Sequence, residues 1–217
     1  MEQKFPVPSL LKEISGYFRN AGFSAYLVGG AVRDFFLKKK ASDWDIATDA
    51  PPQEVMRLFR RTIPTGIEHG TVTIIYKNKH IECTTFRTEA DYTDGRHPAA
   101  VSYAATIETD LARRDFTMNA VAVSLPNGTI VDPFNGRADI RARRIRTVGS
   151  PIDRFLEDGL RPVRAVRFAA QLGFTVDTGT LQAIPQALHI TKKISIERFR
   201  EEFTKMLACL RRFRPAC

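Results

Sequence analysis

The segment AYLVGGAVRD, residues 25–34, decides the fold of this chain. Its first four residues predict a short buried strand, and the rest begins a helix that a run of three lysines ends at residues 38–40. Gly29 and Gly30 lie at the junction, where glycine lets a backbone approach a phosphate closely. Arg33, one helical turn further, could add a bidentate phosphate contact. A tight strand-to-helix turn would need the same glycines for its geometry alone, so both interpretations stay open here.

Helical and extended patterns alternate on both sides of this segment. Apolar residues at helical spacing predict a helix over residues 10–18, which Gly22 ends. Short apolar runs predict a strand at residues 44–48 and a hairpin of two strands at residues 71–76 and 80–86. The first part of the chain therefore combines helices with strands.

The last third predicts a mostly helical unit. Segments at residues 152–172 and 196–210 carry helical patterns, and we place the domain boundary so that the two domains cover residues 1–145 and 146–217. The last helix has an apolar stripe, and few residues follow it. Since such a stripe needs a partner surface, the sequence is expected to be cut short.

Charge distinguishes the two parts in the same way. The chain carries 33 Lys and Arg against 24 Asp and Glu, a net charge of +9. Basic and acidic side chains are equally numerous up to residue 140, so the whole excess belongs to the last third. A neutral unit followed by a basic one favours a polyanionic partner for the second unit.

Composition also excludes several classes of protein. No run of about 18 apolar residues is present, which excludes a membrane span, and the first residues lack the pattern of a secretory signal. The cysteines, Cys83, Cys209 and Cys217, share no close spacing with one another. A disulfide framework or a zinc site is therefore not expected, and a reducing cytoplasm is the predicted compartment.

Two aspartates flank a tryptophan in the predicted strand at residues 44–48. Asp43 and Asp45 alternate with Trp44, so their side chains share one face of the strand while Trp44 faces the core. Adjacent carboxylates repel each other unless a cation lies between them, and Mg²⁺ prefers such oxygen ligands. The pair could equally be two solvated acids at a strand end, because D-x-D is a common pattern.

Glu82 adds a third acid to this pattern. Ile81 and Cys83 suit a core face, which places Glu82 on the opposite face of its strand. If that strand lies beside the aspartate strand, three carboxylates converge. Such a set could hold two metal ions that activate an attacking hydroxyl and stabilise a leaving pyrophosphate. An exposed strand residue is the alternative.

Arginines dominate the candidate binding residues of the second domain. Arg161, Arg164 and Arg167 recur every three residues along a predicted helix, with Val166 among the apolar residues of the other side. Asp158 lies one turn before Arg161. The two side chains could form an ion pair, or they could present an acceptor and a donor to a nucleobase.

Three further features have plain interpretations. The cluster Arg113-Arg114-Asp115 fits an ordinary surface ion pair, and Phe168 fits packing between helices. Residues 91–98 are polar and rich in turn formers, which predicts a mobile loop.

Taken together, four motifs resemble those of one family, the class II tRNA nucleotidyltransferases (CCA-adding enzymes) and their bacterial poly(A) polymerase relatives. The motifs are LVGGAVRD at residues 27–34, DWDIAT at residues 43–48, RRDFTMNA at residues 113–120 and ED-x-x-R at residues 157–161. They follow the family's order and spacing. The resemblance implies an α+β fold: a nucleotidyltransferase head of the polymerase β type, with a mixed β-sheet flanked by helices, followed by an all-α neck.

The resemblance also implies roles for individual residues. Asp43 and Asp45 would bind Mg²⁺, with Glu82 as the third catalytic carboxylate. The triphosphate and ribose would be held by Gly30, Arg33 and Arg114, with Gly29 beside them as a further nucleotide-binding residue. Asp158 and Arg161 would select CTP or ATP at the base edge, with Arg164 and Arg167 nearby.

The implied activity is metal-dependent addition of C and A nucleotides to the 3′ end of tRNA without a template, from CTP and ATP, with release of pyrophosphate. The implied partners are the tRNA acceptor arm, CTP and ATP, while the oligomeric state stays open. The segment GIEHGTVT at residues 66–73 is similar to the CCA-adding branch, and residues 91–98 match a flexible loop tied to the switch from C to A addition. Poly(A) polymerases and enzymes that add only CC or only A share the motifs. An alternative of another class is a truncated, non-catalytic module that binds nucleotide or RNA.

The chain departs from the family's pattern in two places. Pro162 stands where family members usually carry an apolar residue, and a helical proline predicts a kink beside Arg161. Family enzymes also continue for roughly as many residues again, into body and tail domains. The chain is therefore expected to be a fragment or a truncated product.

Overall fold

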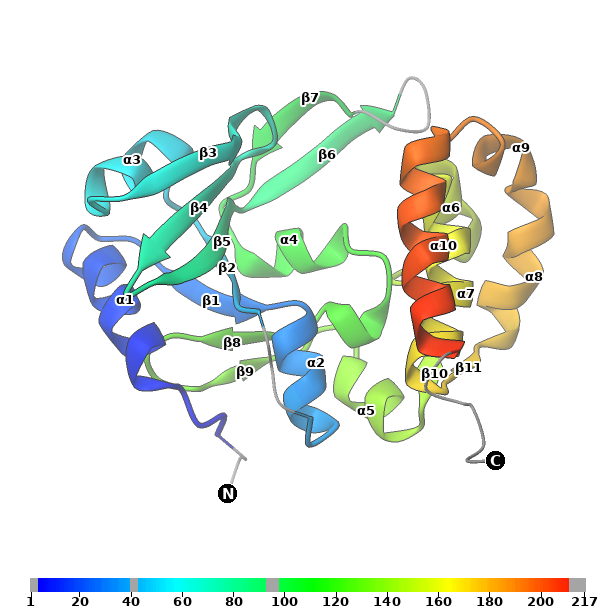
Figure 1. Cartoon of the computed structure of the whole chain (residues 1–217), viewed down its shortest axis with the longest axis horizontal. Helices are drawn as coiled ribbons and strands as arrows, with labels where there is room; N and C mark the ends of the chain where they lie inside the picture. Colours follow the sequence, from blue (N-terminus) through cyan, green and yellow to red (C-terminus); the bar gives the residue numbers. More distant parts are fainter. Residues whose placement is uncertain (1–3, 40–42, 93–97, 211–217) are drawn as a thin grey trace.

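A mixed seven-stranded sheet organises the first part of the chain in this computed structural model, which describes residues 4–39, 43–92 and 98–210 (Figure 1). Its strand order is β3-β4-β5-β2-β1-β8-β9; β2 and β5 are parallel, and the other neighbours are antiparallel. The strands are β1 (Ala25–Val28), β2 (Asp45–Thr48), β3 (Thr62–Gly66), β4 (Thr71–Tyr76), β5 (Lys79–Thr85), β8 (Ala122–Ser124) and β9 (Ile130–Val131).

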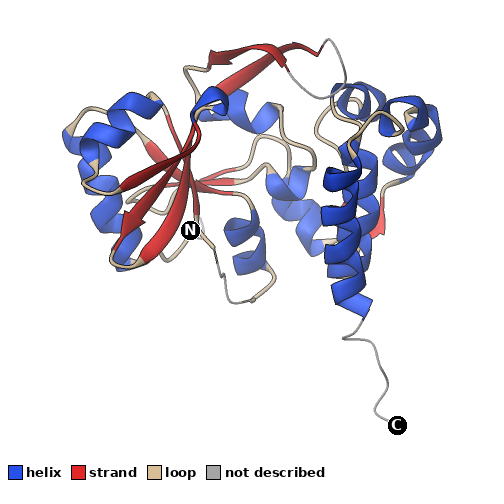
Figure 2. Ribbon diagram, turned by 45° about the horizontal axis from the view of Figure 1, so that its top comes forward, coloured by secondary structure: helices blue, strands red, loops and turns tan. Residues whose placement is uncertain are grey.

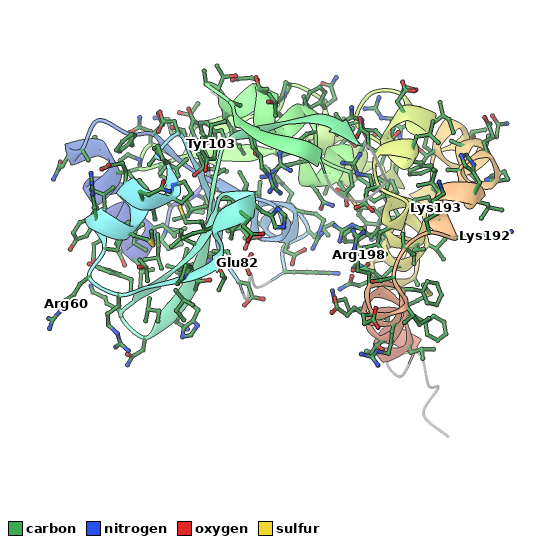
Figure 3. All side chains as sticks on the ribbon, turned by 90° about the horizontal axis from the view of Figure 1, so that it is seen from above. Arg60, Glu82, Tyr103, Lys192, Lys193 and Arg198 are labelled. Atoms are coloured by element: carbon green, nitrogen blue, oxygen red, sulfur yellow. The ribbon has the colours of Figure 1, made fainter. Side chains whose placement is uncertain are left out.

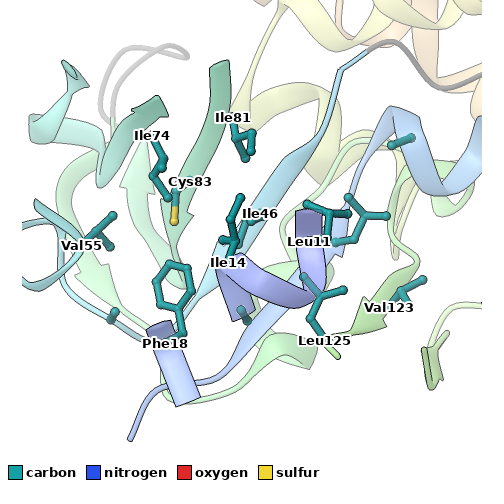
Figure 4. Packing of buried hydrophobic residues seen from close by; sticks show 14 of the residues in the cluster. Leu11, Ile14, Phe18, Ile46, Val55, Ile74, Ile81, Cys83, Val123 and Leu125 are labelled. Carbon is teal, nitrogen blue, oxygen red and sulfur yellow. The ribbon is translucent and has the colours of Figure 1, made fainter. Parts of the chain in front are cut away.

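Helix α1 (Ser9–Asn20) shows how the sheet acquires its core. Leu11, Ile14 and Phe18 recur at helical spacing, are fully buried, and pack against the sheet residues Ile46 and Cys83 (Figure 4). The remaining helices of this part are α2 (Gly30–Phe36), α3 (Pro52–Leu58), α4 (Ile107–Ala112) and α5 (Gly136–Arg141). The predicted α+β head with helices flanking a mixed sheet is confirmed.

The predicted hairpin of β4 and β5 is present, but its turn is one residue shorter than expected because Lys79 belongs to β5. Tyr76 pairs with Lys79, which leaves Lys77 and Asn78 as a two-residue turn with φ of 46° and 59°. Two residues with positive φ match the right-handed twist of the flanking strands. The register brings Glu82 beside Thr73 on one side and Asp45 on the other.

Strands of a second hairpin include both ends of the predicted loop at residues 91–98. β6 (Arg87–Tyr92) and β7 (Pro98–Tyr103) form a separate two-stranded sheet, so Asp91, Tyr92 and Pro98 belong to strands. Pairing between two strands satisfies the backbone of a polar segment as well as that of an apolar one, and the loop interpretation missed this. Residues 93–97 lie outside the described part of the chain.

Helices make up most of the remainder of the chain, at the side of the molecule away from β3 (Figures 1 and 2). They are α6 (Pro151–Glu157), α7 (Leu160–Leu172), α8 (Thr178–Gln186), α9 (Leu188–Thr191) and α10 (Ile196–Leu210). The predicted all-α character needs one correction, because β11 (Thr175–Val176) pairs with β10 (Arg144–Ile145) in a short parallel ladder. That ladder lies across the boundary we predicted near residue 145.

The long helix predicted over residues 152–172 is in fact two helices. The break falls at Asp158 and Gly159, where a Cβ on Gly159 would lie 2.7 Å from the carbonyl oxygen of Ile190. Pro162 is the third residue of α7, where the amide has no partner within the helix. The predicted kink beside Arg161 is therefore wrong.

The arginine side of α7 faces the protein, and the side that carries Val166 faces solvent. Val166 is 46% exposed, whereas Arg161 and Arg167 are each 6% exposed. The arginines face the protein because buried carboxylates and backbone carbonyls receive their donors. In the described part of the chain, no helix is long and apolar enough to span a bilayer. The apolar stripe of α10 is exposed, at Ile196, Phe199, Phe203 and Leu207.

Two glycines give opposite expectations for the stability of this fold. A Cβ on Gly136 would lie 2.1 Å from the carbonyl oxygen of Thr117, whereas nothing lies within 4 Å of a Cβ on Gly16 inside α1. We expect Gly136→Ala to lower the free energy of unfolding by about 2–4 kcal/mol, because backbone must move. Gly16→Ala should raise it by about 0.5–1 kcal/mol. Urea titration of both variants measures the two changes, and a Gly136→Ala protein as stable as the parent would contradict the close approach.

Candidate functional site

The parallel pairing of β2 with β5 brings two acids side by side. Asp45 and Glu82 are register partners, so their side chains leave the same face of the sheet. Asp45 is half-buried and Glu82 is exposed. Burial raises the pKa of Asp45, and the negative charges of Glu82 and Asp43 raise it further, while Arg114 opposes them. The strand neighbourhood on which the three-acid hypothesis depended is therefore present.

The fit of these acids to a divalent cation rests on their charge and chemistry. Asp43 precedes β2 rather than lying within it, yet it is close enough to raise the pKa of Asp45. Within the described residues, no three His, Cys, Asp or Glu side chains gather tightly enough to form a ready metal cluster. Carboxylates that repel one another at a partly open position suit Mg²⁺, which binds through one or two carboxylates and keeps sites for phosphate oxygens.

Gly29 stands directly against this acidic pair. It caps α2 with φ of 72° and ψ of −139°, a conformation that favours glycine. A Cβ at this position would lie 3.0 Å from Asp45 Oδ2 and 3.8 Å from Arg114 Nη1. Gly30 begins α2 itself. The glycine pair therefore serves the turn geometry and also leaves the backbone open beside the carboxylate.

Arg114 belongs to a buried ion-pair cluster rather than to a surface pair. Asp110 is 1% exposed and forms ion pairs with Arg113 Nη2 at 3.0 Å and with Arg114 Nη2 at 2.9 Å. Burial raises the pKa of Asp110, but the two guanidinium groups outweigh it and hold the pKa below its ordinary value. We overlooked Asp110, although its spacing of three and four residues from the arginines is a helical ion-pair signal.

Arg33 connects the glycine turn to the helical part of the chain. It donates to Asp34 and, at 3.0 Å, to Asn119 Oδ1, and the amide of Asn119 donates to Asp115 at 3.0 Å. Asp115 in turn accepts from Arg164 Nε of α7 at 2.9 Å. One chain of hydrogen bonds therefore joins α2 to α7. Asn119 was missed because nothing in its own spacing marks it.

Phe168 lies among three arginines. Its centroid is 3.7 Å from the Arg167 guanidinium carbon, 5.4 Å from that of Arg33 and 5.3 Å from that of Arg164. The ring is buried and meets Phe116 edge-on, as the packing interpretation predicts. It also stabilises the neighbouring cations through its π face.

Asp158 and Arg161 have protein partners of their own. Asp158 accepts from Arg198 of α10 at 2.9 Å and from the amide of Leu160. Arg161 donates to the carbonyl oxygens of Arg154 and Arg113 and forms an ion pair with Glu157. Arg161 thus reaches the end of α4, whereas these partners of Asp158 belong to the helical part.

Glu202 of α10 is a further residue that sequence reasoning missed. It is 3% exposed, hydrogen-bonds Arg167 Nε, and lies 3.6 Å from Arg164 Nη1. Burial raises its pKa, but the arginines outweigh this and lower the pKa below its ordinary value. Both arginines lie 35 or more residues away from Glu202 in sequence, so no local spacing could reveal these contacts.

The glycine turn, the acidic pair and the arginine network form one candidate site between the sheet and the helices. Figure 3 labels Glu82 on the sheet and Arg198 on α10, on facing sides of the two parts. Asp45, Gly29 and Arg114 meet at its centre. A mixed sheet that presents carboxylates beside a strand–glycine–helix turn, ringed by guanidinium groups, defines a nucleotidyltransferase head.

Comparison with known sequences supports this class. The chain matches the family described as "Poly A polymerase head domain" over residues 25–146, and the family described as "Probable RNA and SrmB- binding site of polymerase A" over residues 173–211. The chain belongs to the poly(A) polymerase head-domain family.

Matches to individual relatives extend over most of this chain but over only about half of each relative. A CCA-adding enzyme of Lactobacillus helveticus is 52% identical over 187 residues, 86% of this chain and 47% of that protein. The Bacillus stearothermophilus CCA-adding enzyme in complex with CTP gives a TM-score of 0.86 at 44% identity, covering 94% of this chain and 49% of the other. The Thermotoga maritima CCA-adding enzyme complexed with tRNA gives 0.76 at 26% identity, with 94% and 49% covered. The chain thus spans about half the length of these relatives.

Proposed function

We propose that this chain carries the catalytic part of a template-independent tRNA nucleotidyltransferase, which adds C and A to the 3′ end of tRNA from CTP and ATP. The observation that carries the proposal is the register pair of Asp45 and Glu82 directly beside Gly29. The names of the relatives, including one complexed with CTP and one with tRNA, supply the substrate class.

Asp43 and Asp45 would hold Mg²⁺, with Glu82 as the third catalytic carboxylate. Bound there, the metal would supply activation of a hydroxyl and charge stabilisation on the phosphates. The primer's 3′ oxygen forms a bond to the α-phosphorus, the bond to pyrophosphate breaks, and the hydroxyl proton passes to solvent. The carboxylates would position the reacting groups.

The triphosphate would lie against Gly29, Gly30, Arg33 and Arg114. Arg114 is already oriented by Asp110, and Arg33 by Asn119, so neither guanidinium must be ordered when the nucleotide binds. Donors fixed in advance stabilise the charge that develops on the leaving group.

The helical domain, residues 146–217 in our division, would select the base and hold the RNA. We assign base selection to Asp158 and Arg161, with Arg164 and Arg167 close by. The excess of basic residues in this part would contact RNA phosphates, so binding should weaken steeply with salt. Because Cys83 and Cys209 are free thiols, we place this activity in the cytoplasm.

Nucleotide addition to tRNA that ends at the discriminator base tests the proposal. With Mg²⁺, we expect two C residues from CTP alone and one further A when ATP is added, resolved on a sequencing gel. Products limited to CC, or to a single A on a CC-ended primer, would indicate a specialised enzyme. No product despite measurable CTP binding would contradict catalysis and favour a non-catalytic module.

Poly(A) addition is the second candidate, and the description of the matching family as a poly(A) polymerase head favours it. Long A tails on any RNA with ATP alone would support this activity. Addition that stops after CCA would exclude it.

Base selection by Arg161 gives a separate prediction. We expect Arg161→Ala to reduce the preference for CTP over UTP in kcat/KM by about 10- to 100-fold, because one bidentate base contact supplies discrimination of that size. Single-nucleotide incorporation with each of the four triphosphates measures it. Arg200→Ala, an exposed arginine of α10, is the control. An equal loss for all four nucleotides would contradict base selection and indicate general loss of structure.

A further inference from the structure

A pocket of about 320 Å³ lies on the head between α1, the end of α3 and the β4–β5 hairpin. These elements are at the end of the molecule opposite to α7 and α10 (Figure 1). Figure 3 labels Arg60 at that end and Lys192 and Lys193 at the other. The pocket is therefore separate from the site around Asp45 and Glu82.

Aromatic rings form one wall of this pocket. The Tyr17 centroid lies 5.2 Å from that of Phe59 and 6.0 Å from that of Tyr76. Phe59 is buried, whereas Tyr17 is 43% exposed. An aromatic face that is held by two neighbouring rings and still open to solvent is a stacking surface for a planar ligand.

Glu13 fixes the geometry of this wall. The Tyr76 hydroxyl donates to Glu13 at 2.9 Å, and Lys77 forms an ion pair with the same carboxylate at 2.6 Å. The hydrogen bond to Glu13 raises the pKa of Tyr76 to about 12. Lys77 is therefore already neutralised and adds little net charge for a ligand.

Arg60 and Arg61 supply positive charge at the edge of the pocket. Both side chains are exposed and line it. Among the residues that the structure describes, neither guanidinium has an ion-pair or hydrogen-bond partner. Two consecutive arginines that line the pocket beside an open aromatic face suit a ligand with one planar ring and one anionic group.

We propose that this pocket binds a nucleoside 5′-monophosphate unit, with its base stacked on Tyr17 and its phosphate held by Arg60 and Arg61. Base–aromatic stacking combined with cationic phosphate contacts is how proteins hold single-stranded nucleotides without reading their sequence. The volume lies at the lower end of the usual range for ligand pockets, which suits one nucleotide rather than several. The unit could come from a free nucleotide or from single-stranded RNA. The proposal does not depend on catalysis at Asp45.

Titration calorimetry of the whole chain with AMP tests the proposal. We expect Arg60→Ala/Arg61→Ala to weaken AMP binding at this pocket by about tenfold or more, the effect of removing charge-assisted phosphate contacts. Arg57→Ala is the matched control, because Arg57 is a largely exposed arginine of α3 that pairs with Glu54 outside the pocket. An unchanged AMP affinity in the double variant, or an equal loss in the control, would overturn the proposal.

Further ligands and a second readout locate the site. Adenosine and ribose 5-phosphate should each bind more weakly than AMP, and ribose 5-phosphate binding as well as AMP would refute the stacking. A hexa-adenylate that binds at least tenfold tighter than AMP would support RNA as the source, and equal affinity would support the free nucleotide.

Hydrogen exchange should show AMP protection at residues 57–63 and 75–77. Protection confined to residues 29–33 and 43–48 would assign the binding to the candidate catalytic site and overturn the proposal.

Discussion

Asp45→Asn should abolish nucleotide addition, with kcat/KM at least about a thousandfold below that of the parent chain. The amide keeps the shape of the side chain but removes the charge that would hold a cation beside Gly29 and the nucleotide phosphates. Loss of metal-derived charge stabilisation is worth several kcal/mol, and about 1.4 kcal/mol corresponds to each factor of ten. Asp43→Ala should give a loss of the same order. Single-turnover extension of tRNA with CTP measures both rates.

Asp153→Asn is the matched control for these variants. Asp153 is an exposed acid of α6 that lines neither the acidic pair nor the arginine network, and we expect its replacement to leave the rate within twofold. Equal rates for Asp45→Asn and its parent would refute the metal assignment. A loss in the control as large as that in the Asp45 variant would show that general loss of charge is responsible.

Asp45→Asn should also stabilise the protein in the absence of metal. The pKa of Asp45 is raised in the folded state, so ionised Asp45 disfavours folding at neutral pH. This cost is fully present above the raised folded pKa and is lost as pH falls from there towards the lower unfolded pKa. Asp45→Asn should therefore raise Tm at pH 7, and the gain should shrink in acid. A residue whose removal costs activity and adds stability marks a site built for function.

The sequence predicts the sheet well because its signals are local. The glycine pair at residues 29–30, the hairpin of β4 and β5, and the apolar face of α1 each depend on neighbouring residues alone. Placing Glu82 beside Asp45 needed one further assumption, that their two strands are neighbours, and the structure pairs these strands.

The arginines of α7 show what the sequence could not supply. Three arginines recur along one helix and are predicted to contact the nucleotide, yet Arg167 is buried against Glu202, which lies 35 residues later on another helix. A charge can be buried only where the fold places an opposite charge beside it, and the local pattern of a single sequence does not show which distant carboxylate will do so. Pro162 was misjudged for a related reason, because its cost depends on where the helix begins.

Asp115→Asn should lower the free energy of unfolding by about 3 kcal/mol at pH 7, the usual size for breaking one half of a buried ion pair. Asp115 accepts from the amide of Phe116, from Asn119 and from Arg164, so it joins the head to α7. Asparagine cannot accept all these donors, and Arg164 loses the charge that it faces. Urea unfolding measures the loss, and single-turnover extension should show reduced addition because Arg33 is oriented through Asn119.

The pH dependence distinguishes the ion pair from a simple packing defect. Burial raises the pKa of Asp115, but Arg164 and the hydrogen bonds outweigh it, so the pKa lies below its ordinary value. The stability that Asp115 contributes is therefore present above the unfolded pKa of about 3.9 and is lost as pH falls through the folded pKa. The difference between parent and Asp115→Asn should shrink as pH falls below about 4, whereas a packing defect would keep a constant difference. Asp153→Asn, unpaired among the described residues, should be close to the parent at every pH, so a shrinking difference in the Asp115 variant alone would establish the buried pair as the link between sheet and helices.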